Sequence, residues 1–133
     1  MRLIIAGSRD LDDRHTVAPF IDAYVKAQGS YPAVILSGAC SGVDAIGEWW
    51  ASHYGTPVER YPADWDKHGK AAGPVRNAKM VANADALLVI HWKGSRGSAD
   101  VRRQAEAAGL AIVDVELVKP AAQKRGEQGR LWE

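Results

Sequence analysis

Short apolar segments alternate along this chain with segments of helical periodicity, and this alternation constrains the fold more than any other feature. A short apolar run closed by small residues predicts a buried strand. The segment His15–Gln28 spaces its apolar residues at helical intervals and is followed by Gly29, a common helix end. The predicted strands are Leu3–Ala6, Ala33–Leu36, Pro57–Tyr61, Ala86–Trp92 and Ala111–Leu117. The predicted helices are His15–Gln28, Val43–Tyr54, Pro74–Ala84 and Ser98–Ala108.

A β-α-β order of this kind predicts an α/β fold, a doubly wound parallel sheet with helices on both faces. We expect five strands in the order 3-2-1-4-5, with the third at an edge because it begins with proline. The 133 residues suit a single domain over residues 1–118, followed by a polar C-terminal tail over residues 119–133. In such sheets ligands bind beyond the carboxyl ends of the strands, near the topological switch.

Composition narrows the classes of function. Apolar residues make up 47% of the chain and charged residues 25%, which is ordinary for a globular protein. The net charge of +1 offers no global basic field, so nucleic-acid binding is unlikely and no membrane partner is expected. The apolar stretch at the N-terminus is too short for a signal peptide or a membrane span. A single cysteine, Cys40, permits no internal disulfide, which fits a cytoplasmic protein.

Four glycine-containing loops follow the predicted strands and therefore meet at one edge of the sheet. They are Gly7–Arg9, Ser37–Asp44, Ala63–Asn77 and Lys93–Asp100. Three of them lead directly into helix N-termini, where free N–H groups and the helix dipole favour phosphate or carboxylate. Their glycines allow close backbone approach, and their arginines add bidentate contacts to phosphate. The set predicts a binding site for an anionic ligand.

The residues that we predict to bind this ligand come from all four loops. They are Gly7, Ser8, Arg9, Ser37, Gly38, Gly42, Asp44, Trp65, His68, Lys70, Gly73, Arg76, Asn77, Gly94, Ser95, Gly97 and Ser98. Trp65 or Trp92 would flank a base, although Trp65 is equally suited to wedge its loop onto the core. The P-loop signature and the dinucleotide signature G-x-G-x-x-G are both absent. The four histidines show no paired metal spacing, so we expect neither a metal nor a cofactor.

These loops resemble the SLOG superfamily, in particular its small stand-alone YspA/cpYpsA-type branch. The resemblance rests on GSR, SGACSGVD, PADWDKHGKAAGPVRNAKM and KGSRGSAD, and it covers about residues 2–115. It implies a Rossmann-like fold that binds nucleotides or nucleotide-derived ligands. The wider superfamily includes the lonely-guy phosphoribohydrolases, which activate cytokinins, and the DNA-processing protein of bacterial transformation. Some relatives occur beside phage-defence and signalling modules, where they are thought to sense nucleotide signals.

The resemblance to the lonely-guy enzymes also bears on catalysis. Their R-K-x-x-M-like motif is similar to Arg76–Met80, which makes Arg76 the counterpart of their catalytic arginine. Their P-G-G-x-G-T-x-x-E motif is similar to the turn Gly94–Ser98, but its glutamate position falls on Val101. Asp100 lies one residue early, which is about 100° of rotation on a helix. Carboxylates that can substitute are Asp44, Glu48, Asp64 and Asp100, and no spacing selects one of them.

The sequence therefore predicts binding or sensing of a nucleotide-derived small molecule. The first alternative is a nucleoside-5′-monophosphate phosphoribohydrolase with Arg76, Asp44 and Asp100 as candidate catalytic residues. The second alternative is single-stranded nucleic-acid binding, against which the near-neutral charge argues. Apolar helices and the tail permit a homodimer.

Overall fold

The computed structural model describes residues 1–120, which form a single α/β domain. The strands are β1 (Arg2–Gly7), β2 (Val34–Ser37), β3 (Val58–Arg60), β4 (Ala86–Trp92) and β5 (Ala111–Leu117). The helices are α1 (Arg14–Gln28), α2 (Val43–Tyr54), α3 (Trp65–His68), α4 (Ala72–Ala82) and α5 (Arg96–Ala107), with a 3-10 turn η1 (Gly69–Ala71). Of the predicted tail, the part from residue 121 onward lies outside the described residues.

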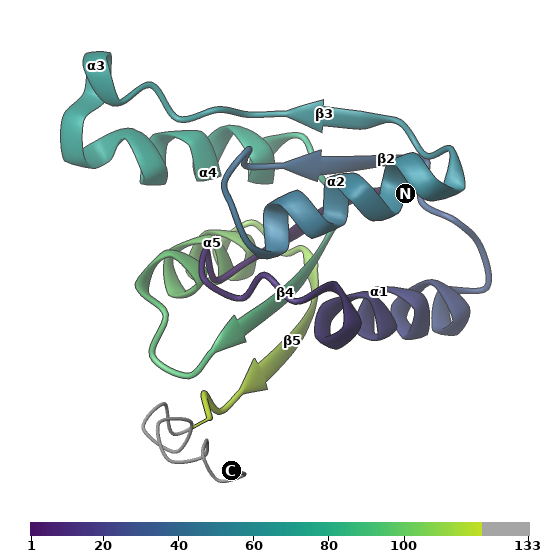
Figure 1. The fold of residues 1–133 in the computed structure, drawn as a ribbon. Helices are drawn as coiled ribbons and strands as arrows, with labels where there is room; N and C mark the ends of the chain where they lie inside the picture. Colours follow the sequence, from purple (N-terminus) through teal and green to yellow (C-terminus); the bar gives the residue numbers. More distant parts are fainter. Residues whose placement is uncertain (121–133) are drawn as a thin grey trace, which may run out of the picture.

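The five strands form one parallel sheet in the order β3-β2-β1-β4-β5. The predicted Rossmann-like fold and strand order are thus confirmed, and β3 lies at an edge, as its proline-led sequence indicated. All strands run in the same direction, so the loops that follow them gather at one side of the sheet (Figure 1). The switch point lies between β1 and β4, the first strands of the two halves.

Alternating side chains of the central strands divide the core into two layers. Leu3 and Ile5 of β1 face α1 and α2, where Trp50 is fully buried. Ile4 of the same strand faces the opposite side, where it joins a cluster with Met80 of α4 and others from α5. The helices therefore cover both faces of the sheet, and they hold the loops between strands and helices in fixed positions.

The stretch between β3 and α4 differs from its prediction as an irregular loop. It contains the short helix α3 and the turn η1, and α4 begins at Ala72 rather than Pro74. Asp64 starts α3 because its Oδ1 accepts a hydrogen bond of 3.1 Å from the backbone N–H of Lys67. Pro74 lies in the first turn of α4, where a missing N–H costs nothing because these groups have no partner within the helix.

Within residues 1–120, no helix has the length and apolar character needed to cross a membrane.

Candidate functional site

A cavity of about 570 Å³ opens at the carboxyl edge of the sheet, where the four predicted loops meet. We call it the main pocket. Its volume lies in the range of small-molecule sites. The predicted residues that line it are Gly7, Ser8, Arg9, Asp44, Trp65, Gly73, Arg76, Asn77, Gly94, Ser95, Gly97, Ser98 and Asp100.

The remaining predicted residues do not line the main pocket. The Ser37 hydroxyl donates to Glu48 Oε2 at 2.6 Å, and Lys70 is exposed. His68 lies beside a second, smaller cavity. Gly38 and Gly42 act through packing instead. A Cβ on Gly38 would lie 2.7 Å from Asp44 Oδ2, and one on Gly42, at φ +75°, would lie 2.2 Å from the Ser8 carbonyl oxygen.

Arg76 is the central charged residue of the main pocket. It is only 8% exposed, although its guanidinium carries a permanent charge. Its Nε donates to Asn77 Oδ1 at 2.8 Å and its Nη1 to the Gly38 carbonyl at 2.5 Å, while Cys40 Sγ lies 3.7 Å from the same nitrogen. All three partners are neutral. Within residues 1–120, Arg76 forms no ion pair with a carboxylate within 4 Å.

Asp100 holds Asn77, which in turn orients Arg76. Asp100 Oδ2 accepts hydrogen bonds of 2.9 Å from Asn77 Nδ2 and from Gln104 Nε2, and its Oδ1 pairs with Arg103 at 2.7 Å. The carboxylate is therefore already engaged by three donors. Its position in the pocket wall suits a positioning role better than proton transfer, because a general base needs an accessible lone pair.

Asp44 lies in the first turn of α2 and is 5% exposed. Burial raises the pKa of its carboxyl to about 6, although the nearby charge of Arg76 and the N–H of Cys40 act in the opposite direction. The Cys40 N–H donates to Asp44 Oδ2 at 3.4 Å. Among the carboxylates that line the main pocket, Asp44 is therefore the one whose pKa is shifted towards neutral pH.

Three helices begin beside the main pocket without a side-chain cap. The cap positions are Gly42 for α2, Ala71 for α4 and Ser95 for α5, and none of their side chains accepts a hydrogen bond from its helix. The Ser95 hydroxyl is instead bonded to that of Ser98 at 3.0 Å. The positive ends of three helix dipoles therefore lie near one region, which favours an anion.

The rim contains residues that the sequence analysis did not select. Lys119 Nζ pairs with Asp10 Oδ2 at 2.7 Å and lies 5.8 Å from the centre of the Trp92 ring. The Arg9 guanidinium lies 5.7 Å from the centre of the Trp65 ring. Asp10 and Lys119 are 109 positions apart, so no local pattern signals their contact.

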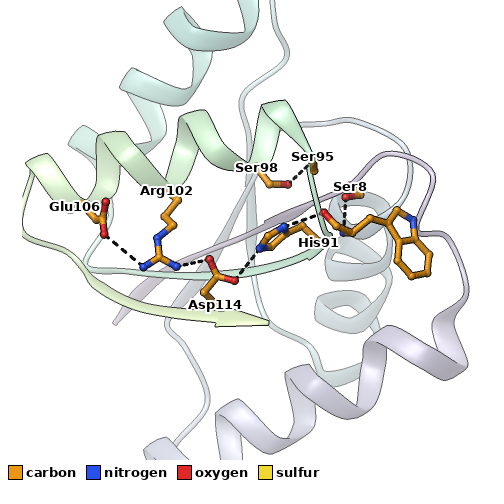
Figure 2. A network of polar contacts seen from close by, with 8 residues as sticks. Ser8, His91, Ser95, Ser98, Arg102, Glu106 and Asp114 are labelled. Atoms are coloured by element: carbon orange, nitrogen blue, oxygen red, sulfur yellow. Dashed lines mark hydrogen bonds and ion pairs between the residues drawn. The ribbon is translucent and has the colours of Figure 1, made fainter. Parts of the chain in front are cut away.

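A polar network links the pocket to β5 and α5 (Figure 2). The backbone N–H of Trp92 donates to Ser8 Oγ at 2.9 Å, and His91 Nε2 lies 2.7 Å from Asp114 Oδ1. Arg102 pairs with the same carboxylate. Burial alone would raise the pKa of Asp114, but the hydrogen bonds from His91 and Arg102 outweigh it and hold that pKa below its ordinary value.

Among residues 1–120, no cluster of three or more His, Cys, Asp or Glu side chains has the arrangement of a metal site.

Comparison with known proteins gives two matches. The model of the "YspA, cpYpsA-related SLOG family" matches residues 1–68. The "Gene 61 protein" of Mycobacterium phage D29 is 34% identical over 119 residues, which span 85% of this chain and 94% of that protein. No solved structure matches significantly. The family match covers β1 to α3, a stretch that contains two of the four pocket loops and the beginning of a third. The similarity to the phage protein extends over most of the chain. The chain therefore belongs to the YspA/cpYpsA-related SLOG family.

Proposed function

We propose that the main pocket binds a nucleotide or a nucleotide-derived small molecule. Its phosphate would lie against the Arg76 guanidinium and the first turns of α4 and α5. Membership of the SLOG family is compatible with ligands of this class. The pocket volume of about 570 Å³ is also suited to a nucleotide-sized ligand.

The observation that carries this proposal is the environment of Arg76. A buried charge is costly unless it is paired, and the direct partners of Arg76 are all neutral. Asp44 compensates part of this charge through space, but it forms no ion pair with Arg76 within 4 Å. A phosphate would provide both the countercharge and the bidentate geometry that arginine prefers.

The aromatic residues of the rim suit the base of such a ligand. Trp65 is half exposed and lines the pocket, with Arg9 beside its ring. Trp92 also lines the pocket. An exposed aromatic face is suited to stacking on a base.

Thermal unfolding in the presence of a nucleotide panel tests the proposal. The panel contains AMP, ADP-ribose, NAD and cyclic nucleotides. A ligand that binds the folded state at a hundred times its Kd stabilises that state by about 2.7 kcal/mol, which is a measurable rise in Tm. If no member of the panel raises Tm at millimolar concentration, the proposal is wrong.

A phosphoribohydrolase is the second candidate, and the raised pKa of Asp44 favours it. A buried carboxyl with a pKa of about 6 is suited to general acid-base catalysis near neutral pH. Val101, at the position of the expected glutamate, is 2% exposed and brings no carboxylate. Asp100 already accepts three hydrogen bonds. Asp44 would then have to act alone.

The assay for this activity is release of free base and ribose 5-phosphate from AMP. The hydrolase predicts product with the wild-type protein and a rate at least about a hundredfold lower for Asp44→Asn, in the range of lost acid-base catalysis. Retained binding without product would identify a sensor rather than an enzyme.

A further inference from the structure

A second cavity of about 180 Å³ lies between α4 and the segment that joins β3 to α3. On the helix side it is lined by one face of α4, from Ala72 to Lys79, at the spacing of residues that share a helical face. On the other side it is lined by Arg60 and the residues that follow, and by His68 of α3. The cavity is far smaller than the main pocket and shares only Arg76 with it.

Basic side chains dominate the lining of this second cavity. Arg60, His68, Arg76 and Lys79 face one carboxylate, that of Asp64. Asp64 is committed to α3, because its Oδ1 accepts the hydrogen bond from the Lys67 N–H. Arg60 is partly compensated by Glu48, at 3.1 Å from its Nε. Within residues 1–120, the side chains of His68 and Lys79 form no hydrogen bond or ion pair.

Arg76 lines both cavities, and this shared residue makes the second cavity more than a basic surface patch. Arg60 and Lys79 are exposed, whereas Arg76 is buried and held in a fixed orientation by Asn77 and the Gly38 carbonyl. An anion in the second cavity would therefore lie beside a preoriented, buried arginine as well as exposed basic side chains. Such preorganisation reduces the entropic cost of binding.

From this arrangement we infer that the second cavity binds a tetrahedral oxyanion of the phosphate class. The source is either free inorganic phosphate or a second phosphate group of a ligand that also occupies the main pocket. The basic lining supplies the charge, and the volume of about 180 Å³ admits a small anion but excludes a nucleoside.

Inorganic phosphate is the probe, and its binding is followed by amide chemical shifts of the full chain. The test variant is Lys79→Glu, in the second cavity. The matched control is Lys26→Glu, which reverses an exposed charge on α1, outside both cavities. Lys79 is exposed, and an unchanged circular dichroism spectrum establishes that its variant folds. We expect Lys79→Glu to weaken phosphate binding by at least about tenfold, while Lys26→Glu changes it by less than about twofold.

Three results would overturn the inference. They are the absence of saturable shifts at tens of millimolar phosphate, equal weakening by both variants, and unchanged binding in Lys79→Glu. Either of the last two would show that the second cavity does not hold the phosphate. Because the probe is inorganic phosphate, a nucleotide panel that gives no response leaves this test intact.

Competition distinguishes the two sources. If NAD displaces the bound phosphate but AMP does not, the second cavity takes the second phosphate of a larger ligand. If phosphate remains bound beside both nucleotides, the cavity is an independent anion site. Displacement by AMP as well, which has only one phosphate, would contradict a separate second cavity.

Discussion

Two arginines on neighbouring helices have opposite surroundings. Arg102 of α5 has a side chain that is 40% exposed, and it pairs with two carboxylates, Asp114 and Glu106 (Figure 2). Arg76 of α4 is 8% exposed, yet its hydrogen-bond partners are a carbonyl oxygen, an amide oxygen and a thiol. The more deeply buried cation is thus the one without a paired anion.

We propose that this difference separates a structural arginine from a binding arginine. The charge of Arg102 is compensated within the chain, where it joins α5 to β5. For Arg76, the protein supplies orientation through Asn77 and Asp100, and in our proposal a ligand supplies the countercharge. Preoriented donors that await a charge are typical of binding sites.

The largest effect on nucleotide binding is expected for Arg76→Met. Methionine keeps the length and apolar packing of the stem but removes the charge and both donors to the ligand. Charge-assisted hydrogen bonds contribute about 1.5–3 kcal/mol each, so nucleotide binding should weaken at least about a hundredfold. Isothermal titration calorimetry with AMP measures the change. Wild-type affinity in this variant would show that Arg76 does not contact the ligand.

The stability of the protein should also depend on Asp44 in a characteristic way. Because its folded pKa of about 6 lies above the ordinary value of 3.8, its favourable contribution is complete below pH 3.8 and is lost as pH rises through 6. Asp44→Asn replaces the carboxyl with an amide that does not titrate, so the variant does not lose this stability as the pH rises. Relative to wild type, the variant should gain up to about 3 kcal/mol between pH 4 and pH 7.5, as two pKa units imply.

Urea unfolding at both pH values measures this gain. Asp10→Asn is the control with the opposite sign, because the hydrogen bond from Lys119 lowers the pKa of Asp10. A stability change for Asp44→Asn that is identical at pH 4 and pH 7.5 would contradict a raised pKa.

The smallest effect on binding is expected for Arg102→Met. This change removes two ion pairs outside the main pocket, so Tm should fall slightly while affinity for AMP stays within about twofold of wild type. A loss of affinity comparable with that of Arg76→Met would remove the distinction between the two arginines.

The sequence predicts the fold well because its signals are local. Apolar runs, helix-ending glycines and the β-α alternation are all contained in short windows, and they specify the strand order through the handedness of the connections. The short helix α3 escaped prediction because four residues carry no periodicity. The start of α4 was placed at Pro74 because proline favours a first helical position, although it is tolerated anywhere in the first turn.

The site can be predicted only in part from the sequence, because its chemistry depends on contacts between segments that are distant along the chain. Glycine-rich loops indicate where the pocket lies, but the burial of Arg76 and the raised pKa of Asp44 arise only when α2 and α4 pack beside β1. In the sequence, Asp100 is a carboxylate close to the expected glutamate position and so a candidate catalytic residue. The structure shows that it accepts hydrogen bonds from Asn77 and Arg103. The contact between Asp10 and Lys119 joins the two ends of the described chain.

A charge exchange between two neighbours of Arg76 tests the central claim most directly. In the double variant Asn77→Asp/Asp100→Asn, the hydrogen bonds from Arg76 to position 77 and between positions 77 and 100 can be kept, while those that Asp100 accepts from Gln104 and Arg103 are weakened or lost. The net charge is unchanged, but Arg76 gains a paired carboxylate, as Arg102 has. We predict by calorimetry that AMP binds at least about tenfold more weakly to the folded double variant than to wild type. Unchanged affinity in a folded double variant would contradict the claim that the unpaired charge of Arg76 recognises the ligand.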